Sequence, residues 1–103
     1  MQELELISFE IISNVGMAKS LAIEAIREAR KENYEIAKNN LVECNNFMLK
    51  AHHSHSSLIQ REANGEKVDF SLILMHAEDQ MLSAETIITL ANEMIEMYIE
   101  LKK

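Results

Sequence analysis

The chain has 103 residues, of which 17 are acidic and ten are basic, so its formal charge is −7. This length suits one domain over residues 1–103, and the scattered basic residues of an acidic chain argue against nucleic acid, because phosphate backbones bind clustered Lys and Arg. No apolar run approaches the roughly 18 residues of a membrane span, and Met1 opens onto an acidic segment rather than a signal peptide, so we expect a cytoplasmic protein without membrane insertion.

The composition predicts an all-α fold. The chain has no Pro and only two Gly, and it is rich in Ala, Leu, Ile, Glu, Lys and Met, which are helix-forming residues. Turn-forming residues gather at 31–33 and 63–67 and divide the chain into three segments. The predicted helices span about 3–31, 34–63 and 70–102.

The ends of these helices carry recognisable capping residues. We expect Asn33 to cap the start of the second helix, Gly65 to follow its end, and Asp69 to cap the start of the third. Short turns between helices of similar length bring neighbours in the chain side by side. The sequence therefore predicts an antiparallel up-down-up three-helix bundle.

Each of the first two helices carries one apolar stripe with the alternating three- and four-residue spacing of a packing face. The stripe of the first helix contains Leu4, Ile7, Ile11, Ala18, Ala22, Ala25 and Ala29, with Val15 beside it. The stripe of the second contains Tyr34, Ala37, Leu41, Cys44, Met48, Ala51, His55 and Leu58. Cys44 is the single cysteine, so we expect a reduced thiol in the core rather than a disulfide.

The third helix carries two apolar stripes. The first contains Phe70, Ile73, Ala77, Met81, Ala84, Ile88, Ala91, Ile95 and Tyr98. The second contains Leu72, His76, Asp79, Ser83, Thr86, Leu90, Met94, Met97 and Leu101, while Glu78, Glu85, Asn92 and Glu96 mark a narrow polar face. A three-helix bundle buries about one stripe per helix, so the second stripe predicts self-association. A homotrimer through the third helix fits this pattern, and so would a dimer or a tetramer.

Two polar residues of the second stripe, His76 and Asp79, could carry chemistry. They lie three residues apart and are therefore neighbours one helical turn apart. A neutral imidazole has a ring nitrogen free to attack phosphorus, which makes His76 a candidate phosphoryl acceptor. Asp79 would most simply bind a polar partner at an interface; three copies meeting at a symmetry axis would instead need protonation or a shared divalent cation.

A second cluster of imidazoles, His52, His53 and His55, lies in the second helix. His52 and His55 are three residues apart, but no Cys accompanies them, and structural zinc sites need four ligands. Surface or core imidazoles are therefore the favoured interpretation. As a further hypothesis, this segment could line the pocket around His76 and offer serine hydroxyls to phosphoryl oxygens.

Three segments together resemble one protein family. Residues 72–81, Leu-Ile-Leu-Met-His-Ala-Glu-Asp-Gln-Met, resemble the active-site segment of the lactose/cellobiose-type enzyme IIA family of bacterial sugar phosphotransferase systems, which reads as aliphatic residues, His-Ala-Gln-Asp-His and Leu-Met. Residues 10–20 and 52–66 are similar to that family's first helix and second-helix ending. Glu78 stands where the family has Gln, and Gln80 stands where it has a second His.

The resemblance implies a homotrimeric phosphocarrier. It implies that His76 accepts a phosphoryl group from the histidine-containing phosphocarrier protein and passes it to a cysteine of enzyme IIB, for uptake of a β-linked disaccharide of the cellobiose, chitobiose or lactose type. It also implies that Asp79 binds a divalent cation, Mg²⁺, at the trimer axis, with no organic cofactor.

Two alternatives accompany this interpretation. The first is a non-catalytic helical protein-interaction module, in which His76 and Asp79 set the register of docked helices. The second is a small metal-binding bundle. Its ligands would be His52, His55, His76 and Asp79.

Overall fold

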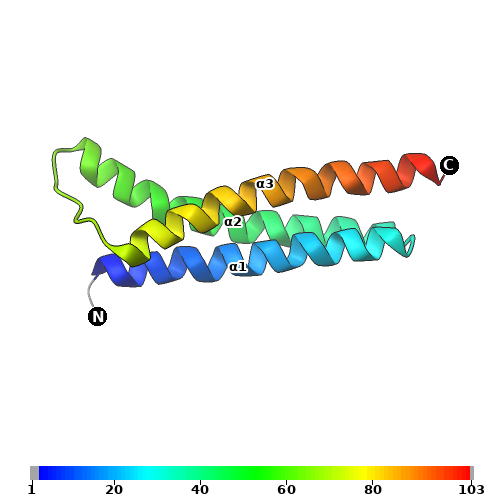
Figure 1. Cartoon of the computed structure of the whole chain (residues 1–103), viewed down its shortest axis with the longest axis horizontal. Coiled ribbons are helices and arrows are strands. Elements are labelled where there is room, and N and C mark those ends of the chain that lie inside the picture. Colours follow the sequence, from blue (N-terminus) through cyan, green and yellow to red (C-terminus); the bar gives the residue numbers. More distant parts are fainter. Residues whose placement is uncertain (1–2, 103) are drawn as a thin grey trace.

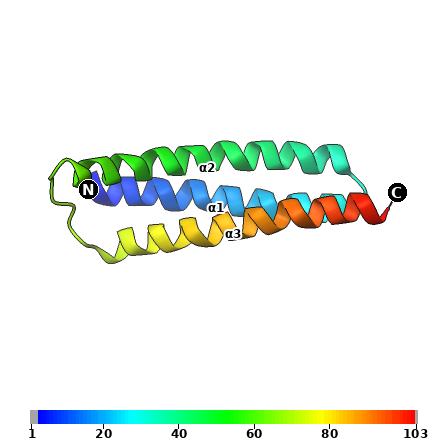
Figure 2. The same cartoon turned by 90° about the horizontal axis from the view of Figure 1, so that it is seen from above.

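Three long helices make up the computed structural model, which describes residues 3–102 (Figure 1). They are α1 (Glu3–Arg30), α2 (Tyr34–Ala63) and α3 (Leu72–Leu101), and the described residues contain no strand. α2 runs antiparallel to its neighbours, so α1 and α3 run in the same direction (Figures 1 and 2). The all-α class and the up-down-up order predicted from the sequence are confirmed.

The turn between α1 and α2 and the end of α2 follow the predicted residues. Asn33 is the N-cap of α2, but its side-chain amide donates to Glu28 Oε2 at 2.8 Å instead of accepting from the first turn of α2. The preceding Glu32 takes a left-handed φ of 66°. Gly65, with a φ of 89°, directly follows the C-cap Asn64, which is where a residue without a Cβ is least strained.

The predicted start of α3 was wrong by two residues. Ser71, rather than Asp69, is the N-cap, because its hydroxyl oxygen accepts the Leu74 backbone N–H at 3.1 Å. Asp69 lies outside the helix beside Lys67, at 3.9 Å. Phe70 therefore precedes the helix with 80% of its surface exposed, and it does not belong to the packing stripe assigned to it. Both Ser and Asp are good caps, so local preference alone could not choose between them.

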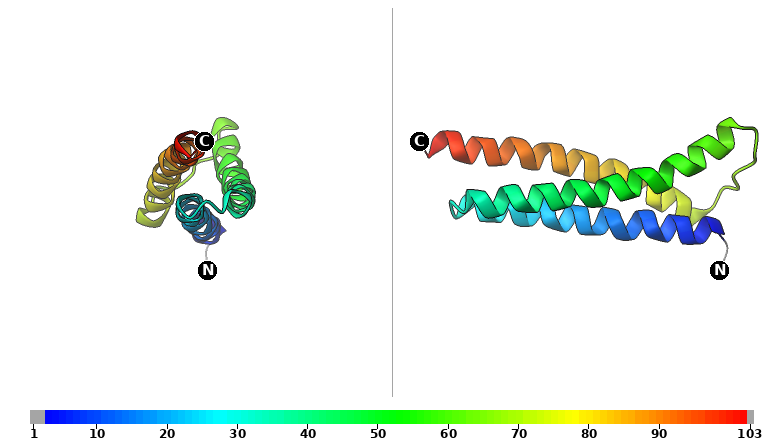
Figure 3. Two further views of the ribbon diagram at one scale, coloured as in Figure 1. Left: turned by 90° about the vertical axis from the view of Figure 1, so that its right-hand side faces the viewer. Right: turned by 180° about the vertical axis from the view of Figure 1, so that it is seen from behind.

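The core lies along α1, which makes nearly all of the contacts between helices, whereas α2 and α3 make few contacts with each other. The view along the bundle shows the three helices at the corners of a triangle (Figure 3, left). Many of the buried residues are alanines, whose small side chains let helix backbones approach closely. The fully buried alanines are Ala18, Ala22, Ala25, Ala37, Ala51, Ala77, Ala84 and Ala91.

The high hydropathy of α1 relates to its place in the core of the bundle. An 18-residue window of this helix reaches a mean hydropathy of 1.4 with at most two charged residues, so by length and composition it could cross a membrane. That result differs from the expectation that no such run exists. The buried residues of α1 are Ser8, Ile11, Val15, Ala18, Ala22, Ala25 and Ala29. The core position accounts for part of this hydropathy; the large apolar residues Leu6, Phe9, Met17 and Ile23 of the same helix are exposed.

The two stripes of α3 have different surroundings. The first is in the core, where Ala77, Met81, Ala84, Ala91 and Ile95 are buried. The second faces outward, and its large apolar residues are exposed over 40–77% of their surface. They are Leu72, Leu90, Met94, Met97 and Leu101. One protomer thus leaves large apolar residues exposed at both ends of the second stripe, with the polar residues between them. This is the feature from which self-association was predicted; the homotrimer itself stays a prediction.

Candidate functional site

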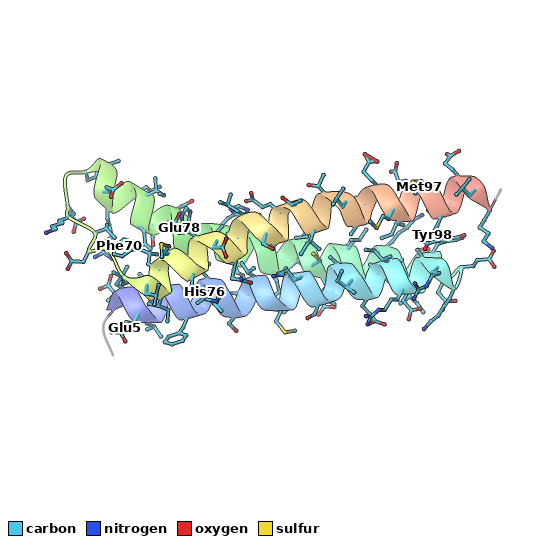
Figure 4. The ribbon with its side chains drawn as sticks, viewed as in Figure 1. Glu5, Phe70, His76, Glu78, Met97 and Tyr98 are labelled. Carbon is cyan, nitrogen blue, oxygen red and sulfur yellow. The ribbon has the colours of Figure 1, made fainter. Side chains whose placement is uncertain are left out.

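His76 lies in the second turn of α3, and its side chain is exposed. No hydrogen bond or ion pair joins its ring to any of the described residues 3–102. Figure 4 shows the ring on the side of α3 next to α1. Its two nitrogens are therefore both open to a reacting group, which is the first requirement for a nucleophilic imidazole.

Asp79 is also exposed, one turn beyond His76 on the same outward stripe. Within residues 3–102 its carboxylate has no ion pair and accepts no hydrogen bond, and it does not bind the neighbouring imidazole. One protomer thus presents both predicted site residues to solvent without using either in its own fold.

Gln80, one turn beyond His76, connects α3 to α1. Its Oε1 accepts a hydrogen bond from the Lys19 ammonium at 2.9 Å, and both side chains are half-buried. Gln80 departs from the family pattern, whereas nothing in the sequence marked Lys19 as a site residue. The pair is 61 residues apart in the chain, so no local spacing could have indicated it.

The opposite side of α3 faces α2. His55 Nε2 lies 2.9 Å from Glu78 Oε1, and His52 Nε2 lies 3.2 Å from Glu85 Oε1. These contacts occur where α2 and α3 begin to diverge toward the segment that connects them (Figures 1 and 2). Glu78 and Glu85 were predicted to mark a polar face of α3, and that face meets the imidazoles of α2.

The pocket beside these pairs does not include His76. Its lining consists of His52, His55, Glu78, Met81, Leu82 and Glu85. His76 and Glu78 are two residues apart and therefore about 200° apart around the helix axis, which Figure 4 shows as opposite directions from α3. The hypothesis that the imidazole segment of α2 lines the site around His76 is therefore wrong within one protomer.

The metal-binding alternative is also wrong for a single chain. No group of three or more His, Cys, Asp or Glu side chains within residues 3–102 is arranged to hold a metal ion. His52 and His55 bind separate glutamates, and His76 lies on the other side of α3. Cys44 is buried in the core as predicted, and burial raises the pKa of its thiol, which disfavours the thiolate that a metal ligand or a nucleophile needs.

Comparison with known proteins identifies the family. The model of the lactose/cellobiose-specific IIA subunit of the phosphotransferase system matches residues 6–99. The chain belongs to this family. It is an enzyme IIA component of a sugar phosphotransferase system, as the resemblance in the sequence implied, and its fold is that of solved family members.

Individual relatives cover nearly the whole chain. The lichenan-specific phosphotransferase enzyme IIA component of Bacillus subtilis is 40% identical over 97 residues, which is 94% of this chain and 88% of the relative. The lactose-specific enzyme IIA component of Lactococcus lactis is 30% identical over 97 residues, which is 94% of this chain and 92% of the relative. The crystal structure of the cellobiose-specific enzyme IIA from Bacillus anthracis superposes with a TM-score of 0.95 at 38% identity, over 99% of this chain and 94% of that one.

Proposed function

We propose that this enzyme IIA accepts a phosphoryl group on His76 from the histidine-containing phosphocarrier protein and passes it to a cysteine of enzyme IIB. The observation that carries the proposal is the state of the four imidazoles: His76 is exposed and unbonded on α3, whereas His52 and His55 are bonded to glutamates. His53 is exposed on α2, away from the α3 segment that resembles the family's active site. The transfer would take place in the cytoplasm and serve the uptake of a β-linked disaccharide.

The first transfer needs only the replacement of one nitrogen by another at phosphorus. A ring nitrogen of His76 donates its lone pair to the phosphorus of the incoming phosphohistidine, one P–N bond forms as the other breaks, and the donor ring keeps the electron pair of the broken bond. In the second transfer the sulfur of a cysteine thiolate replaces the His76 nitrogen at phosphorus. Neither step needs an oxidant, a nucleotide or an organic cofactor, and the protein mainly supplies placement.

The exposed second stripe of α3 supports a homotrimer as the working assembly. Several large apolar residues grouped on one helix face, here Leu90, Met94, Met97 and Leu101, are rarely left in contact with water. If three copies of α3 pack around one axis, the Asp79 carboxylates come together and repel one another. Asp79 has no partner within the described residues, and oxygen ligands suit Mg²⁺, so the residue fits a shared cation, whose bound charge would offset that repulsion.

Phosphoryl labelling tests the proposal. Incubation with phosphoenolpyruvate, enzyme I and the histidine-containing phosphocarrier protein should add one acid-labile phosphoryl group per chain. The variant His76→Ala should take up none. The matched controls His52→Ala, His53→Ala and His55→Ala should all be labelled.

Membership of a phosphotransferase family favours this function over a non-catalytic interaction module. Labelling that survives His76→Ala but disappears with His53→Ala would place the acceptor on α2. A wild-type chain that takes up no phosphoryl group at all would favour the interaction module.

A further inference from the structure

The Lys19 ammonium of α1 is held against α3 by a neutral partner, Gln80. Its hydrogen bond to Gln80 Oε1 measures 2.9 Å, and no carboxylate among the described residues pairs with it. By contrast, the side chains of Arg27, Lys31, Arg61 and Lys67 all lie within ion-pair distance of a glutamate or an aspartate. No described carboxylate therefore neutralises the Lys19 ammonium, and its half-buried position is fixed by the hydrogen bond to Gln80 of α3.

Helix geometry brings this charge within reach of a group on His76. His76 and Gln80 are four residues apart on α3, so their Cβ atoms lie about 5–6 Å apart on one face. A phosphoryl group on the ring extends outward from that face, while a lysine ammonium has three hydrogens, of which Gln80 takes one. The other two hydrogens remain for phosphoryl oxygens.

Gln80 adds donors of its own. Because its carbonyl oxygen accepts from Lys19, the amide nitrogen and its two hydrogens are directed elsewhere. The pair thus presents ammonium and amide hydrogens but no acceptor that would repel an anion. A carboxylate at position 80 would hold Lys19 equally well, but it would neutralise the ammonium and repel a phosphoryl group.

The edge of α1 beside His76 is open. α1 and α3 run in the same direction (Figure 3, right), and Gly16 lies one turn before Lys19 on α1. Gly16 is exposed, and a Cβ built on it meets nothing within 4 Å. No side chain at this position separates the His76 face of α3 from solvent or from an incoming group.

We propose that Lys19, held by Gln80, binds the phosphoryl group carried on His76 and stabilises the phosphorylated protein. The inference rests on the proposed function of His76. Lys19 is the phosphoryl-binding cation, and Gln80 positions it. Charge-assisted hydrogen bonds of this kind are among the stronger ones in proteins, and they form only when the dianion is present.

The test compares five proteins: wild type, Lys19→Met, Lys19→Arg, Gln80→Glu and the control Lys38→Met. Lys38 is exposed on α2 and has no ion pair or hydrogen bond with other described residues. Two quantities are measured for the phosphoryl group on His76: its equilibrium distribution between this chain and the donor carrier, and its hydrolysis half-life. Thermal melting of each variant checks that it folds.

Lys19→Met should shift the equilibrium toward the donor and shorten the half-life by about tenfold, the effect of one charge-assisted contact. Lys19→Arg should stay near wild type, and Lys38→Met should equal it. Gln80→Glu is the decisive variant. A purely structural role predicts that an ion pair with Lys19 preserves or strengthens the fold and leaves the phosphoryl group unaffected, whereas our proposal predicts loss comparable to that of Lys19→Met.

The outcomes separate this inference from the proposed function. Phosphoramidate phosphorylates imidazoles without a protein donor, so the half-life on His76 can be measured by mass spectrometry of the modified peptide even if the carrier does not react. If phosphoramidate labels His76 but the protein carrier does not, the proposed function is overturned. The half-lives of wild type and Lys19→Met then still test the role of Lys19. Equal half-lives and equilibria for wild type and Lys19→Met would overturn the role of Lys19. A His76 that neither reagent labels would overturn both.

Discussion

The two sides of α3 use similar residues in different ways. On the side next to α2, Glu78 and Glu85 bind His55 and His52, and these contacts connect the two helices that otherwise hardly meet. On the side next to α1, His76 has no partner within residues 3–102, and the helix is connected through Gln80 and Lys19 instead. Each imidazole that holds α2 and α3 together has its Nε2 bonded to a glutamate. One that exchanges a phosphoryl group needs a nitrogen free.

The largest expected effect tests this comparison directly. His76→Ala should abolish phosphoryl uptake and leave the free energy of unfolding nearly unchanged, because the ring is exposed and unbonded. His55→Ala should do the opposite: uptake stays, and stability falls by about 1 kcal/mol as the hydrogen bond to Glu78 is lost. Labelling and urea unfolding, measured on both variants at one protein concentration, give the four values. A His76→Ala chain that is markedly destabilised would mean that the ring is structural.

A second experiment concerns the outward face of α3, between these two sides. Met97→Glu places a charge on the exposed second stripe and should dissociate the predicted trimer into monomers in sedimentation measurements. The control Asn92→Glu adds the same charge on the polar face of α3 and should leave the assembly intact. A wild-type chain that sediments as a monomer at micromolar concentration would contradict self-association through this stripe.

Asp79→Leu tests the charged member of the same stripe. Removing a carboxylate that three protomers would bring together should leave the trimer intact or make it more resistant to dilution. Added Mg²⁺ should stabilise the wild-type assembly and have no effect on the variant. Dissociation of the variant would show that the carboxylate makes an attractive contact across the interface.

Substitution of the residue that caps the start of α3 should have a smaller effect than the changes above, and only on stability. Ser71→Ala removes the hydroxyl that accepts the Leu74 N–H and should lower the free energy of unfolding by about 1 kcal/mol. Asp69→Ala, the matched change at the residue first predicted to cap the helix, should have almost no effect. Equal losses from the two substitutions, in urea unfolding curves, would indicate that both residues cap the helix in turn.

The smallest expected change in stability comes from the more exposed of the two pairs between α2 and α3, His52 with Glu85. His52 and Glu85 are both nearly half-exposed at 3.2 Å, and exposed ion pairs contribute little. Glu85→Gln should therefore change stability by less than about 0.5 kcal/mol. A double-mutant cycle with His52→Ala isolates the interaction. A coupling as large as that of His55 with Glu78 would show that both pairs hold α2 against α3 to the same extent.

The amino-acid pattern predicted most of the fold because the information is local. A stripe that repeats every three or four residues marks the buried face of a helix wherever that helix packs. The predicted stripes of α1 and α2 contain the buried residues of both helices, apart from Ser8 and from Val15, which was placed beside its stripe. The missed start of α3 has a local cause as well. Asp69 and Ser71 are both capping residues, and only the hydrogen bond to Leu74 distinguishes them.

The sequence by itself determined that this chain forms three amphipathic helices, that the third has an apolar surface to spare, and that His76 and Asp79 lie on it. Only the tertiary structure decided which imidazoles are bonded to glutamates and which cation is bonded to Gln80, one turn beyond His76. Glu78 and His55 are 23 residues apart, and Lys19 and Gln80 are 61 apart. Such pairs depend on how each helix is rotated about its axis and shifted along its neighbour, and a repeat within one helix carries no record of either.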